Sequence, residues 1–281
     1  MWFYVLSIQK KKYNKTVRYL EKRGFEYKVL VPDCIDDEVA KSYGKKAVVY
    51  DTELCKSYVD FCGTNIQNGA AVGRVASILE AQKNEDISVC LDDDYAGIVA
   101  SKPINTYSKD KLIYVIEKLN EITLQTGIIL GGYSGGAFPE LKNNIMQIWI
   151  MDKEWKVNEL NMILNEDVNF SIKKWHRGIA NFGLAPILRS GAQTAEMDKI
   201  DGNTKHIYAT DRSYRKSFGS VLQDPNNAKL TLNKHNKKRG ALWHHHISWA
   251  SIMPKIIDNS KSFKANYPEL DLSYMQEETE G

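Results

Sequence analysis

The sequence predicts an α/β protein with a mostly parallel sheet that is flanked by helices. Over the first 100 residues, short apolar runs of strand length alternate with segments whose apolar residues recur at helical spacing. This alternation is typical of parallel strands that are buried between helices. The 281 residues are 43% hydrophobic and 26% charged, a globular composition that excludes a disordered, collagen-like or coiled-coil chain.

The first half of the chain has the clearest elements. Phe3–Ile8 is expected to be the first strand, because it is a short apolar run of strand length. Lys11–Arg23 is expected to be a helix that ends at Gly24. The same patterns then predict a strand, a helix, a strand, a helix and a strand at Tyr27–Val31, Asp36–Tyr43, Ala47–Tyr50, Gly69–Gln82 and Ile87–Leu91.

The second half of the chain is less regular. Its patterns predict a helix at Lys109–Thr123, strands at Ile128–Leu130 and Met146–Met151, and a second helix at Val168–Trp175. Beyond about Asp201 the composition becomes polar, basic and aromatic. Because the chain has no internal repeat and no Pro/Ser-rich linker, the simplest organisation is one α/β domain with C-terminal elaborations.

Charge and cysteine content limit the partners and the compartment. The 38 Lys and Arg residues against 35 acidic residues leave a net charge of +3, so any anionic partner must meet a local basic patch. The four cysteines form no C-x-x-C pair, as in a reduced cytosolic protein. No apolar run approaches the roughly 18 residues of a membrane span, and Met1–Ile8 lacks the basic residues of a signal peptide. We therefore expect a cytoplasmic protein without a membrane partner.

Three consecutive acids, Asp92, Asp93 and Asp94, directly follow the predicted strand Ile87–Leu91. Adjacent carboxylates repel one another unless a cation lies between them. In open α/β sheets ligands bind beyond the carboxyl ends of the strands, and Mg²⁺ or Mn²⁺ commonly bridges carboxylates and a diphosphate. A metal and diphosphate site is therefore the functional interpretation, and a solvated acidic turn is the alternative.

A second acidic motif, Glu166-Asp167, opens the predicted helix around Val168–Trp175. Acids at a helix N-terminus are favoured by the helix dipole, which explains the pair without any function. The functional interpretation is that one of the two carboxylates projects into a site as a general base.

Taken together, these motifs resemble those of a known family. The chain has, in order, a helix, a strand that ends in D-D-D, a Gly-rich segment at 131–136, and E-D at the head of a helix that ends in Gly178. This order resembles nucleotide-sugar glycosyltransferases of the GT-A type, in particular the TET/JBP-associated glycosyltransferases found in phages. The Gly-rich segment lacks the spacing of a dinucleotide-binding or Walker loop, and its glycines would let the backbone approach a donor sugar.

Two further features carry the resemblance. Similar members have an Asn-and-Arg helix before L-D-D-D, which Asn65 and Arg74 match here, and paired Asn before a strand, which residues 143–144 match. The resemblance covers roughly residues 4–249. Where the family has its usual polar residue after the first strand, this chain has Ser7-Ile8-Gln9.

The resemblance implies a GT-A fold and roles for individual residues. Asp92 would face the ribose or base side of a nucleotide sugar, expected to be a UDP-sugar. Asp94, with Asp92 as a second ligand, would bind Mn²⁺ or Mg²⁺ on its diphosphate. Asp167, or Glu166 in its place, would deprotonate the acceptor hydroxyl. Asp51 could hydrogen-bond a uracil or ribose. The alternative is that Asp51 is an ordinary aspartate in a turn, without a role in binding. The residues expected to bind the nucleotide sugar are Ser7, Asp51, Asn65, Arg74, Asp92 and Asp93.

Three of the six histidines lie together in Trp243–Trp249. If this segment is extended, His244 and His246 share one face and His245 takes the other. The resemblance places a metal-completing histidine near this point, for which we expect His245. The alternative is a packing cluster of histidines and aromatic rings.

Cations are concentrated in the same part of the chain, where Lys234–Arg239 holds four cations in six residues and Asp211–Phe218 interleaves cations with aromatic residues. A solvated loop is one explanation, and phosphate contacts with a nucleic acid are the other. The residues expected to contact the acceptor are Arg189, Arg212, Arg215, Lys237, Lys238 and Arg239.

The sequence thus predicts a metal-dependent glycosyltransferase that moves a sugar from a nucleotide sugar to 5-hydroxymethylpyrimidine bases in phage DNA, in the host cytoplasm. The alternatives are a GT-A enzyme with a polysaccharide, lipid or protein acceptor and a non-catalytic nucleic-acid-binding module. We expect one domain over residues 1–250, with a nucleotide-sugar-binding half at 1–100, an acceptor-binding half at 101–250 and an extension at 251–281.

Overall fold

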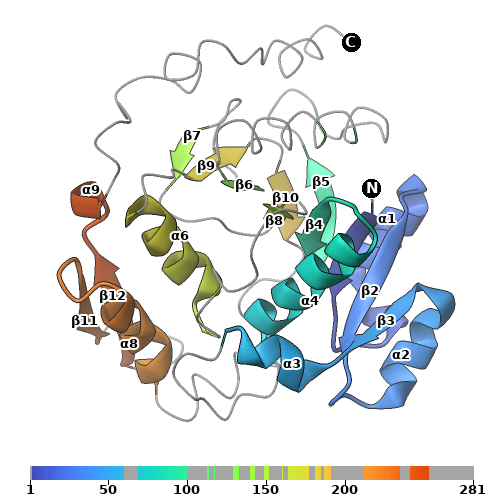
Figure 1. Cartoon of the computed structure of the whole chain (residues 1–281), viewed down its shortest axis with the longest axis horizontal. Coiled ribbons are helices and arrows are strands. Elements are labelled where there is room, and N and C mark those ends of the chain that lie inside the picture. Colours follow the sequence, from blue (N-terminus) through green and yellow to red (C-terminus); the bar gives the residue numbers. More distant parts are fainter. Residues whose placement is uncertain are drawn as a thin grey trace, which may run out of the picture.

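The computed structural model of the chain contains a mixed sheet whose first four strands run parallel (Figure 1). The structure describes residues 2–59, 69–99, 129–132, 140–142, 149–151, 164–176, 181–184, 187–190, 212–234 and 241–252, with residues 113, 117 and 160. Within these residues, eight strands form one sheet in the order β3-β2-β1-β4-β8-β6-β9-β7. In that order the strands span Ala47–Tyr50, Tyr27–Pro32, Trp2–Leu6, Ser88–Leu91, Trp149–Met151, Ile129–Gly132, Asn181–Leu184 and Glu140–Lys142.

The predicted α/β architecture is confirmed by the parallel strands β3-β2-β1-β4 and the helices beside them. The rest of the sheet is mixed. Strand β8 runs antiparallel to both of its neighbours, β4 and β6, whereas β9 is parallel to β6 and β7 is antiparallel to β9. The sequence does not predict these directions, because a short apolar run carries no information on which way its strand runs.

The α-helices in residues 2–99 are α1 (Lys15–Arg23), α2 (Asp37–Tyr43), α3 (Thr52–Ser57) and α4 (Ala70–Lys83). The first three begin at a side-chain cap, which is provided by Asn14, Asp36 and Asp51. Helix α1 starts four residues later than predicted, because the Asn14 side chain caps it by accepting from Val17 N, and residues 11–13 form a 3-10 turn. The helix ends at Gly24, whose φ of 70° is left-handed and suits glycine. The short helix α3 was not predicted.

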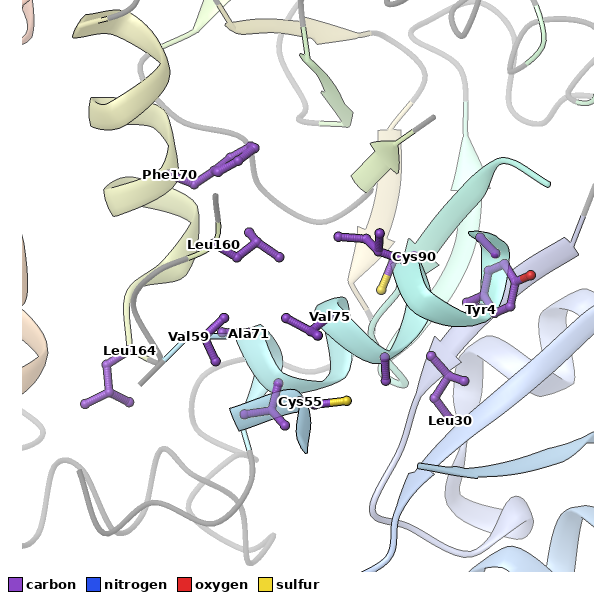
Figure 2. Packing of buried hydrophobic residues seen from close by; sticks show 14 residues of the cluster. Tyr4, Leu30, Cys55, Val59, Ala71, Val75, Cys90, Leu160, Leu164 and Phe170 are labelled. Atoms are coloured by element: carbon purple, nitrogen blue, oxygen red, sulfur yellow. The ribbon is translucent and has the colours of Figure 1, made fainter. Parts of the chain in front are cut away.

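Helices cover the parallel strands on both faces because alternate residues of β1 point to opposite sides. On one face Tyr4 belongs to a core formed with α3 and α4, as Figure 2 shows. On the other face Phe3 packs edge-on against Phe25, which follows α1, with ring centroids 5.1 Å apart. The strand β1 is therefore buried on both sides, as a central parallel strand must be.

Helix α6 (Glu166–His176) is shared by two hydrophobic clusters. Phe170 joins the core of α4, whereas Val168, Ile172 and Trp175 face a second cluster with Ala228. The second cluster belongs to what we call the hairpin unit, the left part of Figure 1, which consists of helix α8 (Tyr214–Gln223) and the antiparallel strands β11 (Ala228–Asn233) and β12 (Leu242–Ile247). The short helix α9 (Trp249–Ile252) follows it.

The remaining predicted elements of the second half are found in part. The strands predicted at Ile128–Leu130 and Met146–Met151 correspond to β6 and β8, and the helix predicted at Val168–Trp175 is the longer α6. Strands β5 (Tyr95–Val99) and β10 (Ile187–Ser190) form a separate antiparallel pair. Apart from positions 113 and 117, the helix predicted at Lys109–Thr123 lies outside the described residues, as does the extension beyond Ile252. None of the described helices has the length and apolar character that crossing a bilayer would require.

Candidate active site

The candidate site lies where the strand order of the sheet reverses. From β1 the chain proceeds to β2 and β3 on one side, and then returns to β4 on the other side of β1. In open α/β sheets such a switch point opens a crevice outside the carboxyl ends of the two strands. Strand β1 ends at Leu6 and is followed by Ser7, and β4 ends at Leu91 and is followed by the three aspartates.

The two strand ends are joined through Asp93. Its Oδ2 accepts hydrogen bonds from Ser7 Oγ at 2.8 Å and from Gln9 Nε2 at 3.2 Å. Its backbone carbonyl accepts from Lys15 N at 3.0 Å, at the start of α1. Burial, with the charges of the neighbouring acids, raises the pKa of Asp93 to about 7, although the bond from Ser7 acts in the opposite direction. Ser7 and Asp93, both predicted to bind the nucleotide sugar, therefore bind each other and fix the aspartate turn.

A buried network of polar side chains holds the aspartate turn in place. Tyr43 Oη donates to the Gln9 carbonyl at 2.7 Å, and Asn14 Nδ2 donates to Tyr43 Oη at 3.0 Å. Thr16 Oγ1 donates to the Asp92 carbonyl at 2.6 Å. Tyr43, Asn14 and Thr16 were not predicted, because their contacts join positions far apart in sequence and leave no local pattern.

The other two carboxylates of the triplet, Asp92 and Asp94, are the predicted metal ligands. The Asp92 side chain is 38% exposed, and its Oδ2 accepts from Tyr95 Oη at 3.0 Å. Burial and the nearby Asp92 charge raise the pKa of Asp94. A cation between the two carboxylates would offset this repulsion, and carboxylate oxygens are the ligands that Mg²⁺ and Mn²⁺ prefer. The donor set of the turn therefore fits the predicted metal.

Arg74 links the aspartate turn to the start of α6. The residue is only 3% exposed in α4, with its Nη2 3.5 Å from Asp92 Oδ1 and its Nε 3.4 Å from Glu166 Oε1. Its neighbour Gly73 lets α4 approach β1, because a Cβ there would lie 2.9 Å from the Leu6 side chain. Arg74 was predicted to bind the nucleotide sugar, but the structure buries it between two carboxylates.

The two acids of α6 have different surroundings. The Glu166 side chain is 13% exposed, and burial raises its pKa while the charge of Arg74 acts in the opposite direction. Asp167 is half-buried and comes next on the helix, where consecutive residues are rotated by about 100°. Through Arg74, the structure brings Glu166, the alternative base, into the ion-pair network with Asp92.

His245 is turned toward the start of α6. Its Nδ1 lies 3.1 Å from Asn165 Nδ2, which also donates to Ser220 Oγ at 3.0 Å. Burial, with the positive charges nearby, lowers the pKa of His245 to about 4, so the imidazole is neutral and Nδ1 accepts from the amide. No group of three or more His, Cys, Asp or Glu side chains in the described part of the chain lies close enough to hold a metal ion, so Asp92, Asp94 and His245 do not form the predicted ligand set. His244 and His246 share the exposed face of β12, as predicted.

The other predicted site residues lie apart from this network or outside the described residues. Asp51 is the N-cap of α3, where its Oδ1 accepts from Leu54 N at 2.8 Å. This is the structural role that the sequence analysis gave as the alternative to nucleotide binding. Arg189 lies in β10 opposite Gly97, and Arg212 and Arg215 are exposed at the start of α8. The predicted residues outside the described ranges are Asn65, Lys237, Lys238 and Arg239.

No protein-family model matches the chain, and no curated protein sequence matches it either. The resemblance to GT-A glycosyltransferases therefore depends on the motif residues of the sequence alone.

Proposed function

We propose that the protein is a metal-dependent glycosyltransferase of the GT-A type, which transfers a sugar from a nucleotide sugar, expected to be UDP-linked, to 5-hydroxymethylpyrimidine bases in phage DNA. One observation carries the proposal. The D-D-D turn lies at the switch point of the sheet, and its Asp92 shares the buried Arg74 with Glu166 of the E-D pair at the start of α6. The two motifs on which the resemblance depends are 74 residues apart in sequence but belong to one network.

The donor would bind beyond the carboxyl ends of β1 and β4. Asp92 and Asp94 would hold Mn²⁺ or Mg²⁺, whose remaining ligands would be diphosphate oxygens and water, a set that needs no third protein side chain. When bound, the ion would neutralise the negative charge that develops on the leaving diphosphate. Asp93, held by Ser7, keeps the two carboxylates in place.

The acceptor hydroxyl needs a base as its oxygen attacks the anomeric carbon and the bond to the diphosphate breaks. Asp167 remains the proposed base, because negative charge at the first turn of α6 is favoured by the helix dipole. Glu166 is the alternative: burial raises the pKa of its carboxyl, but the carboxylate is already in contact with Arg74, which acts in the opposite direction. The basic residues of the second half favour an anionic acceptor such as DNA over a neutral polysaccharide.

The test is mass spectrometry of nucleosides after the protein is incubated with Mn²⁺, hydroxymethylated DNA and a panel of nucleotide sugars. We expect one nucleoside whose mass rises by a sugar residue, with one preferred donor, and no product from the Asp94→Asn variant. Transfer only to a saccharide or protein acceptor would favour the other GT-A function. No transfer to any acceptor, despite intact DNA binding, would favour the non-catalytic module.

A further inference from the structure

The charge of the chain is strongly segregated. Residues 212–252 contain eight Lys and Arg residues and one acid, Asp224, whereas the rest of the chain has 30 cationic and 34 acidic residues. Asp224 is only 4% exposed, and its carboxylate accepts from Asn227 Nδ2 at 3.0 Å and lies 2.8 Å from His176 Nε2. Within the described residues of this range, the cations are Arg212, Arg215, Lys216, Lys229 and Lys234, and the single acid is engaged inside the fold.

Several of these cations gather where α8 begins and the hairpin turns. Trp243 N donates to the Arg212 carbonyl at 2.9 Å, and Ser217 Oγ donates to the Trp243 carbonyl at 3.1 Å, so the first turn of α8 lies against the start of β12. The last residue of β11, Asn233, pairs with Leu242 at the same end. We call this region the basic end, and its members are Arg212, Tyr214, Arg215, Lys216 and Lys234.

The residue types at the basic end are unfavourable for the start of helix α8. The N-terminus of a helix attracts negative charge, yet the first turn of α8 has no acid and carries Arg215 and Lys216. Ser213 occupies the N-cap position, but its buried hydroxyl has no hydrogen-bond partner within the described residues. The helix dipole disfavours cations at this end, whereas an anion bound there would be favoured both by the dipole and by the cations.

The aromatic ring of Tyr214 lies among these cations. Tyr214 is 39% exposed, and its ring stacks on Phe218 at 5.5 Å and meets the edge of Trp243 at 5.6 Å. The two rings hold Tyr214 in one orientation. Aromatic rings beside Arg and Lys are typical of surfaces that bind single-stranded nucleic acid, and a tyrosine hydroxyl can also donate to a phosphate of a duplex.

The hairpin also carries a polar face along its length, with Lys229 and His246 at the end away from the basic end. Lys229 pairs with His246 across the two strands, and both are exposed, as is His244. A two-stranded ribbon of this kind fits the major groove of DNA, where the substituent at C5 of a pyrimidine also lies.

We propose that the basic end is a docking surface for the sugar-phosphate backbone of double-stranded DNA, separate from the carboxylates that would carry out the transfer. The choice of DNA as the polyanion rests on the proposed function. The positive charge, the helix N-terminus and the exposed Tyr214 are the observations that support a nucleic acid over a neutral partner.

The experiment measures the affinity of the full chain for a short unmodified DNA duplex, without donor or metal, over a range of salt concentrations. The variant is Arg215→Glu with Lys234→Glu, and the control is Lys45→Glu with Lys83→Glu, two exposed cations outside the hairpin unit with the same change in charge. A glutamate in the first turn of α8 favours the helix, so the variant is expected to fold. For two lost phosphate contacts the slope of log K against log salt should fall by about 2, with at least about tenfold weaker binding than the control.

Equal DNA binding by variant and control would overturn the docking surface, even if sugar transfer to DNA is observed. Binding of the wild type to phosphatidylserine vesicles but not to the duplex would also overturn it. Selective loss of DNA binding in the variant, combined with no sugar transfer by the wild type, would support the surface and reject the glycosyltransferase.

Discussion

Replacing Arg74 by Met tests whether the buried guanidinium holds the two acidic motifs together. Arg74→Met keeps much of the side-chain volume but leaves Glu166 without its cation, in a position where only 13% of its side chain is exposed. Removing one partner of a buried ion pair costs about 3–5 kcal/mol. Asp92 is 38% exposed and water can screen it, and both contacts are longer than 3.3 Å, so we take the lower end, about 3 kcal/mol.

The assay is thermal unfolding followed by circular dichroism. A loss of about 3 kcal/mol should lower Tm by roughly 6–10 °C for a chain of this size. Adding Glu166→Gln should recover about 1–2 kcal/mol, because an amide needs no counter-charge. Arg18→Met, at an exposed position on α1, is the control and should change stability by less than about 0.5 kcal/mol.

The pH dependence gives an independent check. Burial raises the pKa of Glu166, and Arg74 opposes this shift, so Arg74→Met should raise that pKa further. A carboxyl whose pKa is higher in the folded state than in the unfolded state gains stability as pH falls. The deficit of Arg74→Met should therefore be smaller near pH 5 than near pH 8. A variant as stable as the wild type, or one that Glu166→Gln fails to rescue, would refute the reasoning.

The other predictions concern the site and the hairpin unit. Asp94→Asn should reduce sugar transfer at least about a hundredfold, measured as product per minute with saturating Mn²⁺, since a major electrostatic stabiliser is lost. Asp167→Asn should reduce transfer by about 10²–10⁴-fold while the Kd for the nucleotide sugar changes little, and if only Glu166→Gln has this effect, Glu166 is the base. Burial lowers the pKa of His245 to about 4, so the folded state rejects a proton that the unfolded chain binds below about pH 6.5. Stability should then fall by about 1–2 kcal/mol between pH 6.5 and 4, after allowance for partial exposure, and His245→Gln should remove this slope in urea titrations.

The local patterns of the sequence predict the first half of the fold well. Strand β3 is found at the predicted residues, and α1 ends at Gly24 as expected, because apolar spacing and capping residues are local signals. Helix α3 escapes prediction, since six residues are too few to display a helical period. The directions of β8 and β7 depend on tertiary pairing and leave no trace in their short sequences.

The candidate site was predictable to the level of motifs but not of individual contacts. The acidic turn is found beyond β4 because the strand and its position in an α/β sheet can be recognised locally. The burial of Arg74 depends on the close approach of α4 to β1 at Gly73, and the link from Asp93 to Ser7 depends on strand order. The sequence likewise favoured His245 as a metal ligand, whereas packing of β12 against α6 directs its imidazole to Asn165.

Helix α6 packs against both the parallel sheet and the hairpin unit, because Phe170 belongs to the hydrophobic cluster of the sheet and Trp175 to that of the hairpin unit. Any displacement of the hairpin unit must either carry α6 along or open the packing around Trp175. Motion of α6 along its axis would change the separation of Glu166 from Arg74, which is anchored in α4. A ligand bound to the hairpin unit would thus be mechanically connected to the carboxylates of the sheet. The stiffness of the single eleven-residue helix α6 would set how strongly a movement of the hairpin unit displaces those carboxylates.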